Sequence, residues 1–152
     1  MFQVRIHGRG GQGVVTGAEM LSIAAFLGGR HAQAFPSFGS ERTGAPVVAF
    51  CRMDDKEIRL REPIMQPDAI IIQDPTLPAS ELGMKHVRRA VPNVPLLGAF
   101  AALCGLISLD AVQRAIDEKF KGPVALGNQA AAAEAYKAAM AHETLEQEIH
   151  HA

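Results

Sequence analysis

Long apolar runs, aromatic residues and cysteine are scarce in this chain of 152 residues, which has no Trp, one Tyr and two Cys. No apolar run reaches the roughly 18 residues that a transmembrane helix requires, so no membrane span is expected. The first residues lack the basic, apolar and small-residue regions that follow one another in a signal peptide. We therefore expect a cytoplasmic protein.

An excess of charge of either sign is also missing. The chain carries 15 Lys and Arg against 16 Asp and Glu, which gives a net charge of −1. Proteins that bind nucleic acid or an anionic membrane present a basic stripe, so no nucleic-acid partner is expected. The composition is 48% hydrophobic, and a chain of this length forms about one domain. We expect a single domain over residues 1–152.

The two cysteines, Cys51 and Cys104, lie far apart in the apolar stretches VVAFCRM and FAALCGL. Such surroundings are typical of buried reduced thiols. An iron–sulfur cluster held by one chain takes four close cysteines, and a catalytic thiol requires an electropositive, partly exposed setting. We expect neither a redox metal nor any other metal site on this chain, and no catalytic residue.

Periodicity and breaker residues predict the elements. Strands are expected at 2–7, 30–35, 47–53 and 69–72, and helices at 14–27, 80–90, 96–103, 108–120 and 128–141. After a turn at 54–56, residues 57–60 are expected to pair back as a hairpin. The order predicts an α/β fold, a Rossmann-like layered domain with a largely parallel sheet flanked by helices.

Three of these elements carry a finer expectation. The stretch AIII at 69–72 is wholly apolar, which is typical of a strand covered on both faces. Ser80 is the predicted N-cap of the helix that follows it. The alanine-rich helix 128–141 is expected to be peripheral.

The pattern Gly8-x-Gly10-x-x-Gly13 follows a strand and opens a helix, which is the context of a phosphate-binding loop. The alternative is a tight turn that requires small residues only. A usual NAD site would place an acidic residue at the end of the second strand, but RHAQAF contains none. No Gly-Lys-Ser/Thr follows either, so the motif is not a P-loop.

A second group of residues lies on the loop after the second strand, in FPSFGSERTGAP. In a doubly wound sheet this loop lies at the same edge as the glycine loop, where Arg42 offers a planar donor set to a phosphate. The alternative is a solvated Glu41–Arg42 pair of little energetic weight. Phe35, Pro36 and Phe38 indicate a surface covered by a partner.

Four segments, taken in order, resemble the gamma subunit of the pyruvate/2-oxoacid:ferredoxin oxidoreductase family. They are HGRGGQGVVTGAEML, AFPSFGSERTGAPVVAFCRMDDKEIRLRE, PDAIIIQDPTL and VPNVPLLGAFAALCGLISLDAV. The resemblance covers most of the chain. It implies one subunit of a thiamine-diphosphate enzyme that converts a 2-oxoacid and coenzyme A (CoA) into acyl-CoA and CO2.

The resemblance implies that this chain binds CoA and packs on catalytic subunits. Thiamine diphosphate with Mg and the iron–sulfur clusters are expected on partner subunits of the alpha, beta and delta type, with ferredoxin or a flavin subunit as electron acceptor. The expected CoA-binding residues are Gly8, Arg9, Gly10, Gly11, Gln12, Gly13, Ser40, Arg42 and Asn93. The expected interface residues are Phe35, Pro36, Phe38, Glu41, Thr43 and Pro46.

The chain departs from the family pattern at one place. Members of the family carry several dozen more residues between QDPTL and the VPN segment, where this chain has only PASELGMKHVRR. A strand and a helix or two are therefore expected to be missing near Ala79 and Ser80, either by a natural deletion or because two pieces of a longer chain are joined. The competing function is a free-standing nucleotide-binding or regulatory domain that uses the same glycine loop.

Overall fold

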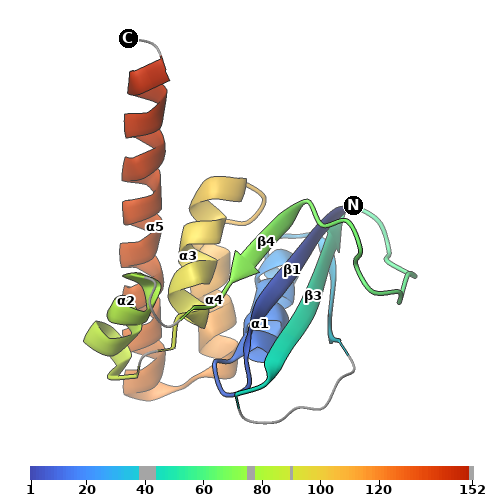
Figure 1. Ribbon diagram of the computed structural model, residues 1–152, viewed down its shortest axis with the longest axis horizontal. Helices are drawn as coiled ribbons and strands as arrows, with labels where there is room; N and C mark the ends of the chain where they lie inside the picture. The colour runs from blue at the N-terminus through green and yellow to red at the C-terminus, as the bar shows by residue number, and fades with distance from the viewer. Residues whose placement is uncertain (38–43, 75–77, 90, 151–152) are drawn as a thin grey trace.

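The computed structural model describes residues 1–37, 44–74, 78–89 and 91–150, apart from the side chains of residues 78 and 144–150 (Figure 1). In chain order the elements are β1 (Phe2–Arg9), α1 (Val14–Leu27), β2 (His31–Pro36), β3 (Pro46–Asp54), β4 (Ala69–Ile72), α2 (Pro78–Val87), α3 (Asn93–Cys104), α4 (Leu109–Lys119) and α5 (Gly122–His150). The predicted α/β layered class is confirmed. No helix in these described ranges is long and apolar enough to cross a membrane.

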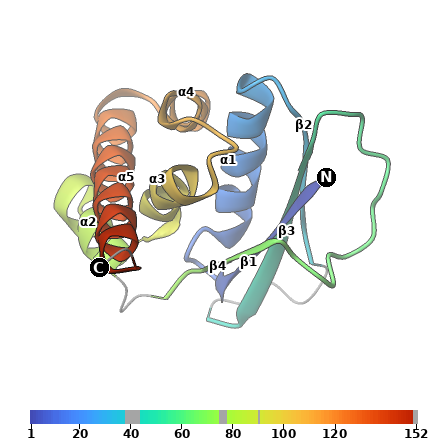
Figure 2. The ribbon, with the colours of Figure 1, turned by 90° about the horizontal axis from the view of Figure 1, so that it is seen from above.

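The four-stranded sheet has the order β2-β3-β1-β4 and is mixed. β3 pairs antiparallel with both β1 and β2, and only β4 runs parallel to its neighbour β1. The expectation of a largely parallel sheet is wrong, because β2 and β3 form a hairpin that inserts β3 between two strands of the same direction. The helices lie on one side of this sheet, with α1 against it and the others beyond (Figure 2).

The first core lies between α1 and the sheet. Val4 and Ile6 on β1 are fully buried, as are Leu21 and Ala25 on α1. Alternation of apolar residues in the strand and their helical spacing in α1 bring these faces together. The predicted helix 14–27 is confirmed, and Gly28 is its C-cap.

The second core lies among α3, α4 and α5. Ala131 and Ala132 on α5 are fully buried, so the expectation of a peripheral helix is wrong. A Cβ added at Gly98 on α3 would collide with the carbonyl oxygen of Ala132. Small residues on both helices let the two backbones approach closely. The alanines of α5 therefore pack against α3 instead of facing solvent.

Two further expectations about local structure are wrong. Residues 57–60 form no strand; instead the guanidinium of Arg52 donates to the carbonyl oxygens of Leu60 and Glu62 and holds this segment beside the sheet. Ser80 lies inside α2, where its hydroxyl donates to the carbonyl oxygen of Asp74 at 3.2 Å, and does not cap the helix.

β4 forms one edge of the sheet among the described residues. Ile71 faces the core at 7% exposure, whereas Ile70 and Ile72 are 56% and 60% exposed. The expectation that this apolar strand is covered on both faces is therefore wrong. The helices cover one face only, which leaves the other side of β4 open in this chain.

Candidate functional site

The glycine loop connects the end of β1 to the start of α1 at one edge of the sheet. Gly11 and Gly13 have φ values of 91° and 74°, a backbone region that other residues rarely adopt. Gly13 is the N-cap of α1 and offers no side-chain cap to the helix. The first N–H groups of α1 are thus left for another acceptor, and the partial positive charge of a helix N-terminus favours an anion there.

Hydrogen bonds join the glycine loop to residues 44 and 45, which directly precede β3 at the same edge of the sheet. Gly10 N donates to the carbonyl oxygen of Ala45 at 2.9 Å, and Gly44 N donates to that of Gly10 at 3.3 Å. The guanidinium of Arg9 reaches the carbonyl oxygen of Gly44 at 3.4 Å. The predicted shared edge is confirmed for this end of the loop between β2 and β3. Phe38, Ser40, Glu41, Arg42 and Thr43 lie outside the described residues.

Asn93, the first residue of α3, lies against the other side of the glycine loop. Its Nδ2 donates to the carbonyl oxygen of Gly13 at 3.5 Å, and its Oδ1 accepts from Val94 N at 2.9 Å. A Cβ at Gly13 would lie 2.6 Å from Asn93 Nδ2, so glycine is required for this approach. The starts of α1 and α3 therefore meet at the glycine loop.

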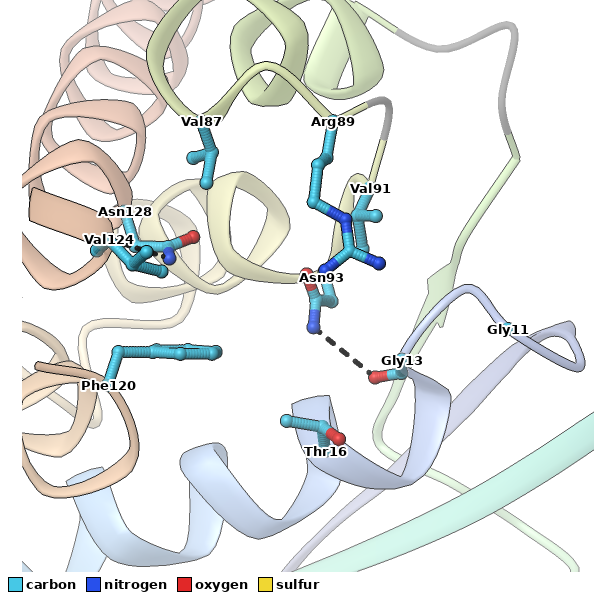
Figure 3. Close-up of a pocket in the computed structure, with 10 residues that line it drawn as sticks. All are labelled: Gly11, Gly13, Thr16, Val87, Arg89, Val91, Asn93, Phe120, Val124 and Asn128. Carbon is cyan, nitrogen blue, oxygen red and sulfur yellow. Dashed lines mark hydrogen bonds between the residues drawn. The ribbon is translucent and has the colours of Figure 1, made fainter.

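A pocket of about 320 Å3 opens beside this junction (Figure 3). One end is formed by the glycine loop and the residues near the start of α3, and the other by α2, the end of α4 and α5. Its lining residues are Gly11, Gly13, Thr16, Val87, Arg89, Val91, Asn93, Phe120, Val124 and Asn128. Segments from both halves of the chain thus build one site.

Three of the predicted CoA-binding residues, Gly11, Gly13 and Asn93, line this pocket. Gly8, Arg9, Gly10 and Gln12 do not line it; they build and brace the loop. Gln12 Oε1, for example, accepts a hydrogen bond from Arg9 N at 2.7 Å. A Cβ at Gly8 would lie 2.7 Å from a methyl carbon of Val14, which explains that glycine by packing alone.

Sequence reasoning missed Thr16, Arg89, Phe120 and Asn128 as pocket residues. Arg89 could have been identified from the sequence, because it lies four residues before the predicted ligand Asn93, in VRRAVPN. Phe120 and Asn128 carried no such signal, because only the packing of α4 and α5 against α3 brings them to the glycine loop.

The pocket carries positive charge. Arg89, an exposed residue, lines the pocket together with Asn93 (Figure 3), and no acidic residue lines it among the described residues. No carboxylate in the described ranges forms an ion pair with Arg89. With the N-terminus of α1 opposite, the geometry suits a phosphate or another anion.

Both cysteines are free thiols and lie outside the pocket. Burial raises the pKa of Cys51 to about 12, so this thiol stays protonated at neutral pH. Cys104 is half-buried rather than buried, which corrects the expectation for that residue. Within the described ranges no group of three or more His, Cys, Asp or Glu lies close enough to hold a metal ion.

The described members of the predicted interface differ in exposure. Pro46 is exposed, while Phe35 and Pro36 are half-buried. The ring centroids of Phe35 and Phe50 lie 5.1 Å apart. The guanidinium carbon of Arg52 lies 5.1 Å from the centroid of the Phe35 ring. Phe35 therefore already has contacts within this chain.

Comparison with known proteins decides the family. The profile of the family described as pyruvate ferredoxin/flavodoxin oxidoreductase matches residues 3–78 and 75–138. The pyruvate synthase subunit PorC of Methanocaldococcus jannaschii is 41% identical over 90% of this chain and 96% of its own length. The chain is a gamma subunit of the pyruvate/2-oxoacid:ferredoxin oxidoreductase family. The gamma subunit common to the pyruvate and ketoisovalerate oxidoreductases of Thermococcus kodakarensis is 35% identical over 94% of this chain and its whole length.

Solved structures agree on the fold of this gamma subunit. The pyruvate oxidoreductase subunit PORC of Thermotoga maritima superposes with a TM-score of 0.78 at 27% identity, covering 90% of this chain and 95% of that one. A 2-oxoglutarate:ferredoxin oxidoreductase of Magnetococcus marinus gives a TM-score of 0.71 at 18% identity, over 92% of this chain and 31% of that one. The second likeness shows the fold alone.

The gamma subunit is shorter than its relatives in its interior. The alignments with the two archaeal relatives span 170 and 184 positions, more than the 152 residues available here. The two stretches matched by the family profile meet at residues 75–78, between β4 and α2. Both observations support the internal shortening expected near Ala79 and Ser80.

Proposed function

We propose that this gamma subunit binds the phosphate-bearing end of CoA and positions it for an oxidoreductase complex whose catalytic groups lie on other subunits. The observation that carries the proposal is the pocket in which Gly13, Arg89 and Asn93 meet at the N-terminus of α1. Coenzyme A offers a pyrophosphate and a 3′-phosphate, which suit backbone N–H groups and a guanidinium. The solved oxidoreductase of Magnetococcus marinus contains bound coenzyme A, which supports this ligand.

The role of the chain in this proposal is positioning. The phosphates are held at the glycine loop and Arg89, while the thiol arm extends out of the pocket toward thiamine diphosphate on a partner subunit. Holding a reactant in the right place lowers the entropic part of the barrier without any acid, base or nucleophile on this chain. Arg42 and Ser40 remain proposed ligands from the loop between β2 and β3.

The redox groups are proposed to lie on the alpha, beta and delta-type partners, with ferredoxin or a flavin subunit as acceptor. The cysteines of this chain do not fit an iron–sulfur cluster. The chain has only two, Cys51 on β3 and Cys104 on α3, whereas a cluster held by one chain takes four close cysteines. The family membership also favours a subunit over a free-standing regulatory domain. The cytoplasm is the proposed location, on the composition of the sequence.

The partner surface is proposed to include the described residues Phe35, Pro36 and Pro46, with Phe38, Glu41 and Thr43. Of these, Pro46 pairs with Arg9 at the start of the glycine loop, so a catalytic subunit docked there would lie close to the pocket. Hydrogen exchange of the free chain and of the assembled complex tests this surface. Amides at 44–48 should gain protection in the complex, and equal exchange in both samples would refute the docking site.

Arg89→Ala tests the CoA proposal. In the assembled complex the substitution should raise KM for CoA by an amount equivalent to about 1.5–3 kcal/mol, the range for a lost hydrogen bond to a charged group. The CoA-independent decarboxylation step should keep its rate. Arg61→Ala is the matched control, because Arg61 is exposed on the segment between β3 and β4, away from the pocket. An unchanged KM for CoA in Arg89→Ala would contradict the proposal.

A further inference from the structure

β4 forms an edge of the sheet that nothing in its sequence protects from further pairing. Within the described residues it pairs with β1 alone, and no strand lies on its other side. Its sequence, AIII, consists of an alanine and three isoleucines, which strongly favour strands. Edge strands ordinarily carry a charge, a proline or a bulge that opposes pairing, and residues 69–72 contain neither charge nor proline. The open edge of β4, residues 69–72, can therefore accept one more strand.

Two apolar side chains lie along this open edge on the face of the sheet that the helices leave uncovered. Ile70 and Ile72 are both more than half exposed, while Ile71 between them faces the core. An adjoining strand would shield both isoleucines, because neighbouring strands lie only about 4.8 Å apart. Pairing at this edge therefore buries apolar surface in addition to forming backbone hydrogen bonds.

An apolar groove lies beyond the open edge, among α2, α3 and α5. It has a volume of about 340 Å3, and its lining includes Leu82 of α2, Leu96 and Leu103 of α3, and Ala138 of α5. Leu103 is 62% exposed. α3 lies between β4 and α5 in both ribbon views, so these helices continue past the last described strand (Figures 1 and 2). A strand added to β4 would thus lie against α3, next to the groove.

The relatives carry additional chain at this place. The alignment with PorC of Methanocaldococcus jannaschii spans 170 positions but only 90% of this chain, so roughly thirty residues of that relative have no counterpart here, enough for a strand, a helix and their connections. The stretches matched by the family profile meet at residues 75–78, shortly after β4 ends at Ile72. Both observations support the absence of an element directly after β4, where the helices extend farther than the sheet.

A second copy of this chain does not fit the open edge. A twofold pairing of β4 with β4 of another copy would be antiparallel and would place both sets of helices on the same face of the joined sheet. α3 already extends past β4 on that face, so the two copies of α3 would occupy the same space (Figure 2). The occupant must be a segment that brings no such helices, supplied by another polypeptide.

We propose that the open edge of β4 receives a β-strand in trans, from a partner subunit of the oxidoreductase complex. The strand is an extended, uncharged and apolar segment of about four to six residues, the usual length of a strand. Its backbone pairs with residues 69–72, its inner side chains meet α3 and the groove, and its outer ones cover Ile70 and Ile72. The partner thereby replaces the strand that the shortened chain lacks.

This interface is separate from the partner surface proposed above. Phe35 belongs to β2, which forms the opposite edge of the four-stranded sheet, and Pro46 begins β3. The inference rests on the proposed assembly with catalytic subunits and is independent of the CoA pocket.

Hydrogen exchange of the free chain and of the assembled complex tests the backbone pairing. Amides at 69–72 should exchange about fivefold or more slowly in the complex, as expected for the net worth of one added hydrogen bond. Amides at 112–119 of α4 are the internal reference and should keep their rates, because they lie away from the open edge. Unchanged exchange at 69–72 would overturn the proposal.

The double variant Ile70→Lys with Ile72→Lys tests the edge without altering the core, because both side chains are exposed. Charges on an edge strand oppose pairing, so its affinity for the other subunits should fall about tenfold or more. Phe26→Lys with Leu126→Lys is the matched control and should keep the parent's affinity. These two residues are 70% and 67% exposed, on α1 and α5, outside the edge and the groove. Thermal unfolding of the free variants shows whether they are folded, and parent affinity in the edge variant would contradict the proposal.

A graft tests the edge independently of the partner. The PorC residues of Methanocaldococcus jannaschii that have no counterpart here are inserted at the junction of residues 75–78. Amides at 69–72 of the free graft should already exchange slowly, and assembly should slow them no further. A flexible Gly-Ser insert of equal length should leave them at the parent's rates. If the PorC graft exchanges there as fast as the parent, no additional strand belongs at this edge and the proposal is wrong.

The outcomes also separate this inference from the proposed function. If amides at 44–48 gain protection in the complex and those at 69–72 do not, the assembly stands and only the added strand is refuted. If neither stretch gains protection, the proposed subunit contacts fall together. If 69–72 become protected in the free chain as its concentration rises, a second copy occupies the edge and the inference is wrong.

Discussion

Asn93 Nδ2 donates to the carbonyl oxygen of Gly13 at 3.5 Å, which links the first residue of α3 to the N-cap of α1. Two helices from different halves of the chain therefore begin at one point. Each helix N-terminus carries partial positive charge, and Arg89 lies beside them at the same pocket. The glycine loop alone would be a turn; the contact with Asn93 makes it one side of a site.

Gly13→Ala should destabilise the chain more than Gly11→Ala. Both positions have positive φ, so each alanine costs about 1–2 kcal/mol of backbone strain. Only at Gly13 does the new Cβ also displace the Asn93 amide, whereas nothing lies within 4 Å of a Cβ at Gly11. The additional loss should be about 1 kcal/mol, the net worth of a hydrogen bond, measured by urea unfolding.

The Asn93→Ala background provides the control for this comparison. Without the amide, alanine at Gly13 should cost no more than alanine at Gly11. If the difference between the two glycine variants persists in that background, the contact with Asn93 is not its cause.

Gly98→Ala should destabilise the packing of α3 on α5 by about 1–3 kcal/mol, the usual range for overpacking. The new methyl group would collide with the backbone of Ala132, so no side-chain rotation relieves it. Gly28→Ala is the matched control, at φ −81° with its nearest atoms at 3.3 Å, and should cost less. Chemical denaturation measures both variants, and equal losses would show that the two helices can move apart freely.

Iodoacetamide should modify Cys104 in the native chain and spare Cys51. Burial raises the pKa of Cys51 to about 12, so at pH 8 on the order of one thiol in ten thousand is the reactive thiolate. Cys104 is half-buried at the end of α3. Peptide mapping by mass spectrometry reads both sites, and both should react after denaturation. Rapid native modification of Cys51 would contradict its burial.

Acid should weaken the contact between α2 and α5 through Glu134. Its carboxylate accepts hydrogen bonds from Lys85 at 2.7 Å and pairs with His86 at 2.6 Å, which hold its pKa below the ordinary value of 4.5. A carboxylate whose pKa is lower in the folded than in the unfolded chain stabilises the fold at any pH above its unfolded-state pKa. This stabilisation is lost as the pH falls through its folded-state pKa. Glu134→Gln should therefore flatten the loss of stability below about pH 4.5.

Glu81→Gln is the control for this titration, because Glu81 is exposed on α2 and has no ion-pair partner among the described residues. Denaturant unfolding at a series of pH values reads the slope. If Glu134→Gln lost unfolding free energy with falling pH as steeply as the parent chain, other carboxylates would dominate the acid transition.

The sequence by itself determined the elements whose signals are local. The alternation in β1 and the helical spacing of 14–27 each bury one face, and Gly28 ends that helix. Ser108, the first residue of the expected helix 108–120, is the N-cap of α4 and accepts a hydrogen bond from Ala111 N at 3.1 Å. These features depend on contacts within a few residues, so a short window of sequence contains their cause.

The tertiary structure decided what depends on distant partners. The position of β3 between β1 and β2 is one such feature, and the burial of the α5 alanines against α3 is another. Both depend on which apolar surfaces of the other elements are still uncovered. Local periodicity is the same in either case, so the sequence predicted a largely parallel sheet and a peripheral helix, and both were wrong. The pocket shows the same division: Gly11 and Gly13 belong to a readable motif, but Arg89, Phe120 and Asn128 reach it only because three helices pack around α3. Packing is a property of the whole chain, and no local pattern contains it.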